Sequence, residues 1–406
     1  MTDNAKSPIL SKNVSSSIGL EPPLRFPGFE DAWERKKLEK ICSINPSSGK
    51  LPAEFYYIDL ECVVNGEIVS QLNVISRANA PSRAQRVLSP DDVLYQTVRP
   101  YQKNNFFFKQ MLDLPAVAST GYAQIRGLDC SIKFIYHLLH TDKFVLEAMK
   151  RSTGTSYPAI SSNDLAEIDV CYPTRTEQQK IADFLSLVDE RIEKQRQLVE
   201  VLKRYKRGLF LSLYNNSQKS TFLFEDIYVK AAEGGTPSTT DSSYYIDGNI
   251  PFAKIEDLNS QYLNSTNCYI TEKGLKSSSA WIVPIDSILF SNGATIGSCS
   301  INKIPTSTKQ GILGIVPKEN YSVEFLYFLF TSWIFIKKVK AITTKGTMDC
   351  AYLKDINKIT LDIPDMYTQL KIQRIMNFFE RGIEKQVKTL NFLIHQKNGL
   401  LQQMFI

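Results

Sequence analysis

The chain has 406 residues, of which 43% are apolar and 22% are charged, values typical of a soluble globular protein. This length exceeds one ordinary core and predicts two domains with connecting elements. No run of 18 or more apolar residues is present, which excludes an obvious membrane span. Residues 1–23 are polar and rich in serine, which predicts a disordered leader rather than a secretory signal.

Cysteine usage and charge narrow the class further. The seven cysteines are dispersed and form no Cys-x-x-Cys pair, so neither a zinc site nor a redox motif is indicated, and we expect a reducing, cytoplasmic setting. Basic and acidic residues balance in 1–172 (19 and 19) and in 216–363 (14 and 14). The net charge of +6 therefore comes from 173–215 (9 and 6) and 364–406 (6 and 3). A basic surface on the larger segments would require local segregation of charge.

Taken in chain order, the first predicted domain covers residues 24–172. Short β-rich runs such as 55–60 and 92–98 are separated by turn residues, and a helix is predicted around 134–151. The second predicted domain, 216–363, has a similar run at 281–284 and a predicted helix around 325–341. Each domain is therefore expected to be α+β.

A long helix is predicted after each domain, at 173–215 and at 364–406. The two segments align at a constant offset of 191 residues, with 12 of 43 positions identical, and each follows a strand-like run that ends at Pro173 or Pro364. Similarity extends upstream, where 134–138 aligns with 325–329 and Gly154-Thr155 corresponds to Gly346-Thr347 with a one-residue slip. The chain is thus predicted to be two copies of one domain-plus-helix unit.

Apolar residues in both helices recur at alternating steps of four and three, which predicts a coiled-coil seam. The predicted helix-pairing positions are Ile181, Leu185, Val188, Ile192, Gln195, Val199, Leu202 and Leu209 in the first helix, and Ile372, Met376, Phe379, Ile383, Gln386, Leu390, Leu393 and Leu400 in the second. Lys206 and Lys397 interrupt the seams at equivalent positions. We expect an antiparallel pair with Gln195 opposite Gln386; the alternative is that each helix packs on its own domain.

Clusters of arginine, amide and aromatic residues in loop-like sequence are candidates for DNA contact, because Arg and Lys can read guanine and Asn and Gln can read adenine. In the first domain these candidates are Arg77, Arg83, Arg86, Thr97, Arg99, Tyr101, Gln102, Lys103 and Asn104. In the second they are Ser291, Asn292, Thr295, Lys309 and Gln310. Residues 216–363 contain no arginine, so the second domain must use other donors.

Motifs for catalysis are not found. There is no Gly-x-x-x-x-Gly-Lys-Ser/Thr phosphate loop, and 45–48 (Asn-Pro-Ser-Ser) lacks the aromatic residue that an amino-methyltransferase loop needs to stack a flipped base. The glycines of 293–297 lack the context of a dinucleotide site. His137 and His140 lie three apart on a predicted helix, but no third metal ligand is evident.

The segment Glu177-Gln178-Gln179-Lys180-Ile181-Ala182 after a strand and proline, followed by a long helix, resembles the central region of type I restriction–modification specificity subunits. The opening 24–29 (Leu-Arg-Phe-Pro-Gly-Phe) with Trp33-Glu34, and the stretch 83–99, also look like that family. The second helix departs, because Thr368 stands where the first has Glu177. The resemblance covers nearly the whole chain.

The resemblance implies two target recognition domains held apart by an antiparallel helical pair, in a subunit that is not itself catalytic. It implies double-stranded DNA, two adenine-N6 methyltransferase subunits and motor–nuclease subunits as partners, and no membrane. It also implies that S-adenosylmethionine, ATP and Mg²⁺ belong to those partners and that this chain binds no cofactor or metal. Two alternatives stay open: a coiled-coil adaptor that binds no DNA, and a fused nuclease or methyltransferase with a cryptic catalytic site.

Overall fold

The computed structural model describes residues 21–69, 71–109, 112–293, 295–344 and 350–406. The chain forms two compact units, one of residues 1–195 with 389–406 and one of residues 196–388. Both units combine sheets with helices, and each contains half of each long helix. This arrangement confirms the predicted α+β class. Most of the predicted leader (1–20) and the predicted Gly346-Thr347 loop lie outside the described residues.

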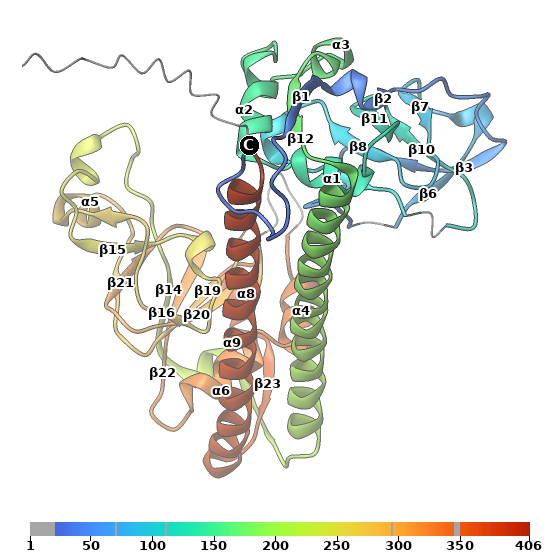
Figure 1. The fold of residues 1–406 in the computed structure, drawn as a ribbon. Coiled ribbons are helices and arrows are strands. Elements are labelled where there is room, and N and C mark those ends of the chain that lie inside the picture. The colour runs from blue at the N-terminus through green and yellow to red at the C-terminus, as the bar shows by residue number, and fades with distance from the viewer. Residues whose placement is uncertain (1–20, 70, 110–111, 294, 345–349) are drawn as a thin grey trace, which may run out of the picture. The chain divides into compact units, whose positions relative to one another are not determined.

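The first unit contains two four-stranded sheets (Figure 1). Their orders are β6-β3-β10-β7 and β2-β11-β8-β9, and β10 is parallel to β3 whereas the other neighbours are antiparallel. A separate antiparallel pair, β1 with β12, precedes the long helix. The strands are β1 (Glu34–Lys37), β2 (Cys42–Ile44), β3 (Glu54–Ile58), β4 (Val63–Val64), β5 (Glu67–Ile68), β6 (Asn73–Ser76), β7 (Ala84–Val87), β8 (Val93–Gln96), β9 (Phe106–Phe107), β10 (Ala116–Ser119), β11 (Tyr122–Gly127) and β12 (Asp169–Tyr172).

The second unit repeats this topology. Its sheet β17-β15-β21-β18 has the same pairing as β6-β3-β10-β7, including one parallel pair, β15 with β21. The other sheet, β14-β22-β19-β20-β16, corresponds to β2-β11-β8-β9 with one strand added. The strands are β13 (Ser220–Leu223), β14 (Tyr228–Glu233), β15 (Ile250–Ala253), β16 (Tyr262–Leu263), β17 (Tyr269–Ile270), β18 (Ile282–Val283), β19 (Ile288–Ser291), β20 (Cys299–Asn302), β21 (Thr306–Thr308), β22 (Ile312–Pro317) and β23 (Thr360–Ile363).

The prediction of one helix around 134–151 and one around 325–341 is wrong, because two short helices occupy each of these segments. The hydroxyl of Thr141 accepts a hydrogen bond from Phe144 N and so caps a new helix, and Ser332 does the same for Phe335. His140 consequently lies in the break and not on the helix that carries His137. The short helices are α1 (Ile132–Leu138), α2 (Asp142–Lys150) and α3 (Ser162–Ala166) in the first unit, and α5 (Glu272–Lys276), α6 (Val323–Phe330), α7 (Trp333–Ala341) and α8 (Leu353–Ile356) in the second.

A buried glutamine fixes the start of each long helix, α4 (Arg175–Asn215) and α9 (Met366–Met404). Gln178 donates to Pro173 O (2.8 Å) and accepts from Ser131 N (2.8 Å). Gln369 donates to Pro364 O and accepts from Ser322 N, both at 2.9 Å. Each amide thus ties the strand–proline–helix junction to the beginning of α1 or α6, with both polar ends satisfied.

Glu177, which has no equivalent in the second helix, supports a connection specific to the first unit. Its carboxylate is 1% exposed and accepts from Nε and Nη2 of Arg25, both at 2.8 Å. This bidentate ion pair ties the segment before β1 to α4. At the equivalent place in the second unit, Thr368 N donates to the Asp365 carboxylate at the start of α9.

Within each unit the two half-helices pair antiparallel (Figure 1). In the first unit, Ile181 and Leu185 of α4 share a core with Leu401 and Met404 of α9. In the second, Phe210 and Tyr214 of α4 share a core with Ile372 and Met376 of α9. The predicted seam residues are all buried or half-buried. Each domain is therefore covered by the beginning of its own helix and the end of the other.

The predicted register is wrong by about one helical turn. With Gln195 opposite Gln386, Asp189 would face Phe392 and Lys206 would face Ile375. Instead Asp189 pairs with Lys397 (2.6 Å), and Lys206 pairs with Glu380.

The two ion pairs are equivalent under the 191-residue repeat. Each seam lysine is only about one-fifth exposed, 18% for Lys397 and 22% for Lys206. The interruptions that the sequence shows in both seams are thus a matched pair of lysine–carboxylate contacts.

Among the described residues, no helix is long and apolar enough to cross a membrane.

Candidate nucleic-acid interface

Backbone hydrogen bonds gather the predicted contact loops of the first unit along one edge. Thr120 N donates to Arg83 O (2.9 Å), and Thr97 N donates to Gly121 O (3.0 Å). Ile160 N then donates to Thr97 O (3.0 Å). Segments that are far apart in sequence, around residues 83, 97, 120 and 160, are therefore held side by side. We call this hydrogen-bonded set of loops the first edge.

The turn Pro100–Gln102 is held at both ends. Arg99 and Lys103, which flank it, adopt left-handed backbone conformations with φ of 55° and 54°. Gln102 accepts from the amide of Gln96 (2.8 Å), and Lys103 pairs with Asp142 at 2.5 Å. This anchoring leaves the side chains of Gln102 and its neighbour Tyr101 exposed. The turn is preorganised, and the charge of Lys103 is already compensated within the protein.

The other predicted first-domain contacts differ in how far their side chains are exposed to solvent. Arg77 and Arg83 are exposed, whereas Arg86 is half-buried on β7 and burial lowers the pKa of its guanidinium. Thr97 is buried, and its hydroxyl donates to Gly121 O (2.8 Å). Asn104 is half-buried and its side-chain Oδ1 accepts from Asn65 N (3.0 Å). Arg77 and Arg83 are the members of this group that solvent reaches freely.

Tyr157 was missed by the sequence analysis. The guanidinium carbon of Arg99 lies 4.3 Å from the centre of the Tyr157 ring, and Tyr157 is 62% exposed. Arg99 N also donates to Pro158 O (2.7 Å). The Gly154-Thr155 loop thus contributes its own aromatic side chain to the first edge. A tyrosine in a Ser-Tyr-Pro turn was the available signal, but nothing in the sequence joins it to Arg99.

The second unit has an equivalent edge, which we call the second edge. Asn292 N donates to Gly311 O (3.0 Å), and Ala351 N donates to Asn292 O (2.8 Å), as Thr97 does with Gly121 and Ile160. The side chains of Ser291 and Asn292 are fully buried, and Asn292 Nδ2 donates to Ala351 O at 3.0 Å. In this conformation these two predicted contacts hold the edge together and do not reach solvent.

Thr295, Lys309 and Gln310 are exposed on the second edge. A neighbouring loop, 234–240 (Gly-Gly-Thr-Pro-Ser-Thr-Thr), was not among the predicted contacts. In it the hydroxyl of Thr236 accepts from Gln310 N (3.3 Å). Gly234 is required there, because a Cβ would lie 2.1 Å from Thr308 O. The hydroxyl-rich loop therefore packs directly beside Lys309 and Gln310.

The equivalence of the sheets in the two units identifies a second segment that was not among the predicted contacts. The connection between β17 and β18 corresponds to the β6–β7 connection that carries Arg77 and Arg83. It contains Lys273, which lies 3.6 Å from Asp241, and the exposed Lys276. Because the two connections share little sequence, only their place in the sheet relates them.

Among the described residues, the predicted histidine pair is not joined by a third metal-binding side chain. His137 is buried with its Nδ1 3.9 Å from Asp189, and His140 Nδ1 lies 2.7 Å from Tyr136 O. Burial lowers the pKa of His140 to about 4, so this ring is neutral at pH 7. Within the described ranges, His, Cys, Asp and Glu side chains form no group of three suited to a metal ion.

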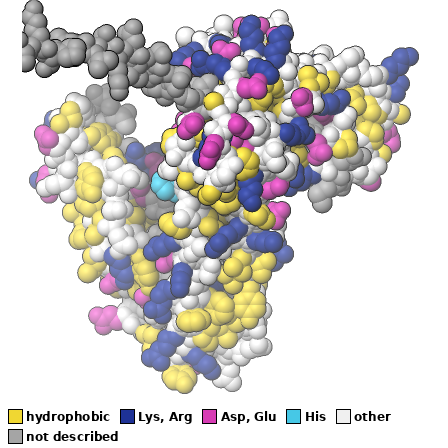
Figure 2. All heavy atoms as spheres, in the orientation of Figure 1, with side chains coloured by type: hydrophobic (Ala, Val, Ile, Leu, Met, Phe, Trp, Pro, Cys, Tyr) yellow, Lys and Arg dark blue, Asp and Glu magenta, His cyan; other side chains and the backbone are white. Residues whose placement is uncertain are grey.

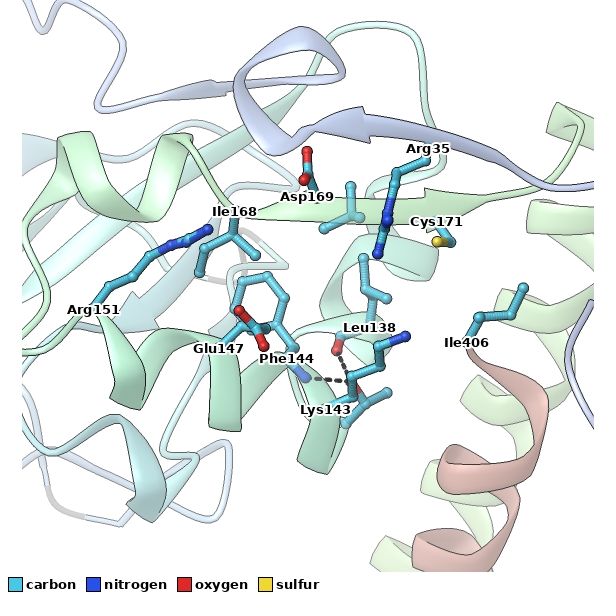
Figure 3. Close-up of a pocket in the computed structure, with 12 residues that line it drawn as sticks. Arg35, Leu138, Lys143, Phe144, Glu147, Arg151, Ile168, Asp169, Cys171 and Ile406 are labelled. Carbon is cyan, nitrogen blue, oxygen red and sulfur yellow. Dashed lines mark hydrogen bonds between the residues drawn. The ribbon is translucent and has the colours of Figure 1, made fainter. Parts of the chain in front are cut away.

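A cavity of about 160 Å³ lies in the first unit between the β1–β12 pair and α2 (Figure 3). Arg35 and Asp169 line it from the strands, and Lys143, Glu147 and Arg151 line it from α2 and its end. Ligand pockets usually occupy about 300–1,000 Å³. The cavity contains none of the predicted DNA contacts and is separate from the first edge.

Known proteins with similar sequences and folds agree on one family. The model of the type I restriction modification DNA specificity domain matches residues 30–204 and 218–391. The MjaIX specificity subunit of Methanocaldococcus jannaschii is 31% identical over 180 residues, which are 44% of this chain and 41% of that protein. The HindI specificity subunit of Haemophilus influenzae is 23% identical over 76% of this chain and 84% of its own length.

Solved structures share the fold. A chain from a study of complex assembly and conformational transition of the type I R-M system has a TM-score of 0.56 and 21% identity, with 93% of this chain and 98% of that chain covered. The S subunit of M. genitalium has a TM-score of 0.52 and 16% identity, covering 95% and 99%. The family match spans most of the chain in two copies and confirms the resemblance seen in the sequence. The chain therefore belongs to the family of type I restriction–modification specificity subunits and contains two copies of their DNA specificity domain.

Proposed function

We propose that each unit reads one half of a bipartite double-stranded DNA target through its hydrogen-bonded edge. The observation that carries this proposal is the repetition of one backbone arrangement, Thr97 between Gly121 and Ile160, and Asn292 between Gly311 and Ala351. The scaffold is the same in both units, but the exposed side chains on it differ. Two such edges would bind two different base sequences separated by bases that neither contacts.

The side chains suggest different chemistry for the two halves. The first edge offers arginines, which bind guanine O6 and N7 with two hydrogen bonds. The second lies in a segment without arginine and offers Lys309, Gln310 and the hydroxyls of the 234–240 loop. Lysine can also contact guanine or phosphate, and glutamine can pair with adenine. We therefore expect the two half-sites to differ in sequence.

Selection from a pool of random duplexes tests this function directly. The full chain should enrich duplexes that share two short conserved blocks separated by a fixed number of unconserved base pairs. Affinity should fall linearly with the logarithm of salt concentration, because phosphate contacts release counterions. Binding with no enriched sequence, or enrichment of one uninterrupted block, would contradict the two-edge model. A chain that binds no duplex at all would favour the adaptor alternative.

We infer that catalysis belongs to partner subunits: adenine-N6 methyltransferases that use S-adenosylmethionine, and motor–nuclease subunits that use ATP and Mg²⁺. The purified chain should then leave a duplex uncut and unmethylated when given Mg²⁺ and S-adenosylmethionine. Activity of the chain alone would instead favour the fused-enzyme alternative.

Exposed apolar residues on the long helices support docking of two copies of one partner. Leu187 (63% exposed) and Phe378 (69%) are equivalent under the repeat, as are Val201 (56%) and Phe392 (59%). Each unit therefore carries one residue of each equivalent pair. Figure 2 shows hydrophobic side chains at the surface over the lower parts of α4 and α9, among Lys and Arg. Contiguous exposed apolar patches mark protein-binding surfaces, and because these positions recur in both units we assign them to two methyltransferase subunits.

Charge substitutions on this surface should remove the methyltransferases one at a time. We expect Leu187→Lys and Phe378→Lys each to lose one copy, and the double variant to lose both, because a lysine cannot be buried against an apolar partner without cost. The mass of the reconstituted complex, measured by light scattering, gives the number of copies. Val229→Lys is the control, since Val229 is 71% exposed on β14 and not on a long helix. Two copies retained in the double variant would refute this docking surface.

A further inference from the structure

We propose that Arg99 reads a guanine in the half-site bound by the first unit, and that Tyr157 is the positioning residue that holds its guanidinium for that contact. This inference rests on the proposed function and deepens it. It assigns one base type to one side chain and gives a role to the 153–157 loop, whose residues are all exposed.

The backbone of Arg99 is fixed in a conformation that few side chains favour. Its φ is 55°, in the left-handed region, which is unfavourable for a residue other than glycine. The hydrogen bond from Arg99 N to Pro158 O (2.7 Å) holds it there. Conformations of this kind persist where the surrounding structure imposes them, and they cluster at binding sites.

The guanidinium of Arg99 has a platform but no acceptor. Its central carbon lies over the Tyr157 ring, 4.3 Å from the ring centre, and no hydrogen bond or ion pair from its side chain occurs within the described part of the chain. Its Nε is buried without a partner. Two other arginines of the same unit have acceptors: Arg25 pairs with Glu177, and Arg126 donates to Asp92 at 2.8 and 2.9 Å, whereas Arg86 Nε is, like Arg99 Nε, buried without a partner.

Stacking orients the guanidinium plane without using its donors. The ring face of a tyrosine attracts the cation and limits its rotation, so the terminal Nη donors stay available in the plane. Guanine presents two acceptors, O6 and N7, with the spacing of that donor fork. A phosphate would accept a contact from almost any geometry and would not require a stacked, fixed fork. The platform therefore favours base reading over backbone contact.

The test compares variants of the full chain on duplexes carrying the sequence enriched by the wild-type protein, with each base pair of both half-sites changed in turn. We expect Arg99→Ala to remove the preference for one G·C pair in one half-site, with about a tenfold to hundredfold loss on the enriched duplex. Tyr157→Ala should relax the same position, and Tyr157→Phe should behave as the wild type because it keeps the ring. The double variant Arg99→Ala with Tyr157→Ala should add little to Arg99→Ala alone.

Different results would overturn different parts of the proposal. An equal loss of affinity for all duplexes in Arg99→Ala would make Arg99 a phosphate contact and overturn the guanine assignment. Relaxation of a different position in Tyr157→Ala, or no relaxation, would overturn the positioning role. Failure of the wild-type chain to enrich any sequence would instead be a failure of the proposed function. Arg207 is an exposed arginine on α4, so Arg207→Ala is the matched control for lost charge. Thermal unfolding of each variant verifies that it folds.

Discussion

Replacing residues 24–150 with the corresponding segment of a relative that has another target is expected to change one half of the DNA target and leave the other half intact. The predicted DNA contacts from Arg77 to Asn104 lie in this segment, Tyr157 and Ile160 of the first edge are kept from this chain, and the second edge lies wholly outside the segment. Each mismatched base pair typically costs about 1–3 kcal/mol. The old half-site should therefore lose almost all selective binding. Selection of the hybrid's preferred duplexes from a random pool identifies both halves.

The junctions of this exchange must respect contacts that leave the segment. Arg25 pairs with Glu177, and Trp33 packs edge-on against Phe405 at 6.4 Å between ring centres. The donor should therefore have an arginine and an aromatic residue at these positions, or the hybrid will fold poorly for reasons unrelated to reading. The reciprocal exchange of residues 216–363 is the control and should change only the other half. A hybrid whose two half-sites both change would contradict the assignment of one half-site to each unit.

The repeat and the long helices could be predicted because they depend on local sequence. A proline such as Pro173 or Pro364 ends the strand before it through its own backbone geometry. A four–three spacing places apolar residues on one helix face in any context. The predicted runs before the helices are observed as β12 and β23. Burial of the seam residues followed from their spacing alone.

The solvent exposure of individual loop residues could not be predicted from local sequence. Asn292 and Gln310 are both polar residues in turn-like sequence, yet Asn292 is buried against Ala351 and Gln310 is exposed. The difference depends on which segment packs over each residue, and Ala351 is 59 positions away from Asn292. Tyr157 is a similar case, because its partner Arg99 lies in another loop. Long-range packing, and not residue type, decides which side chains an edge presents.

The helix register was predicted from the wrong polar pair. Facing glutamines can satisfy each other, which made Gln195 and Gln386 a reasonable choice. A lysine held largely away from water needs a carboxylate even more, since an unpaired buried charge costs more than an unpaired amide. The pairs Lys206–Glu380 and Asp189–Lys397 meet that need in both units. The interrupting lysines were therefore the better guide to register.

Inserting one heptad into each long helix, after Gln195 and after Lys388, is expected to lengthen the unread spacer of the DNA target. Both points coincide with the boundary between the two compact units, so each unit keeps its own antiparallel contacts. Seven helical residues add about 10 Å, which is about three base-pair steps of 3.4 Å. We expect both half-site sequences to be unchanged and the spacer to grow by up to about three base pairs. Selection from random duplexes measures spacer and half-sites together.

An insertion in one helix alone is the informative control for this prediction. A heptad after Gln195 without its counterpart after Lys388 leaves seven residues of α4 with no matching residues in α9. The chain must then loop out the extra turns or sacrifice ion pairs such as Lys206–Glu380. It should bind less tightly, with the original spacer or with none defined. If the double insertion kept the original spacer while binding selectively, the helices would not set the distance between half-sites. If it altered a half-site sequence, base reading would depend on the helices and could not be assigned to the two edges alone.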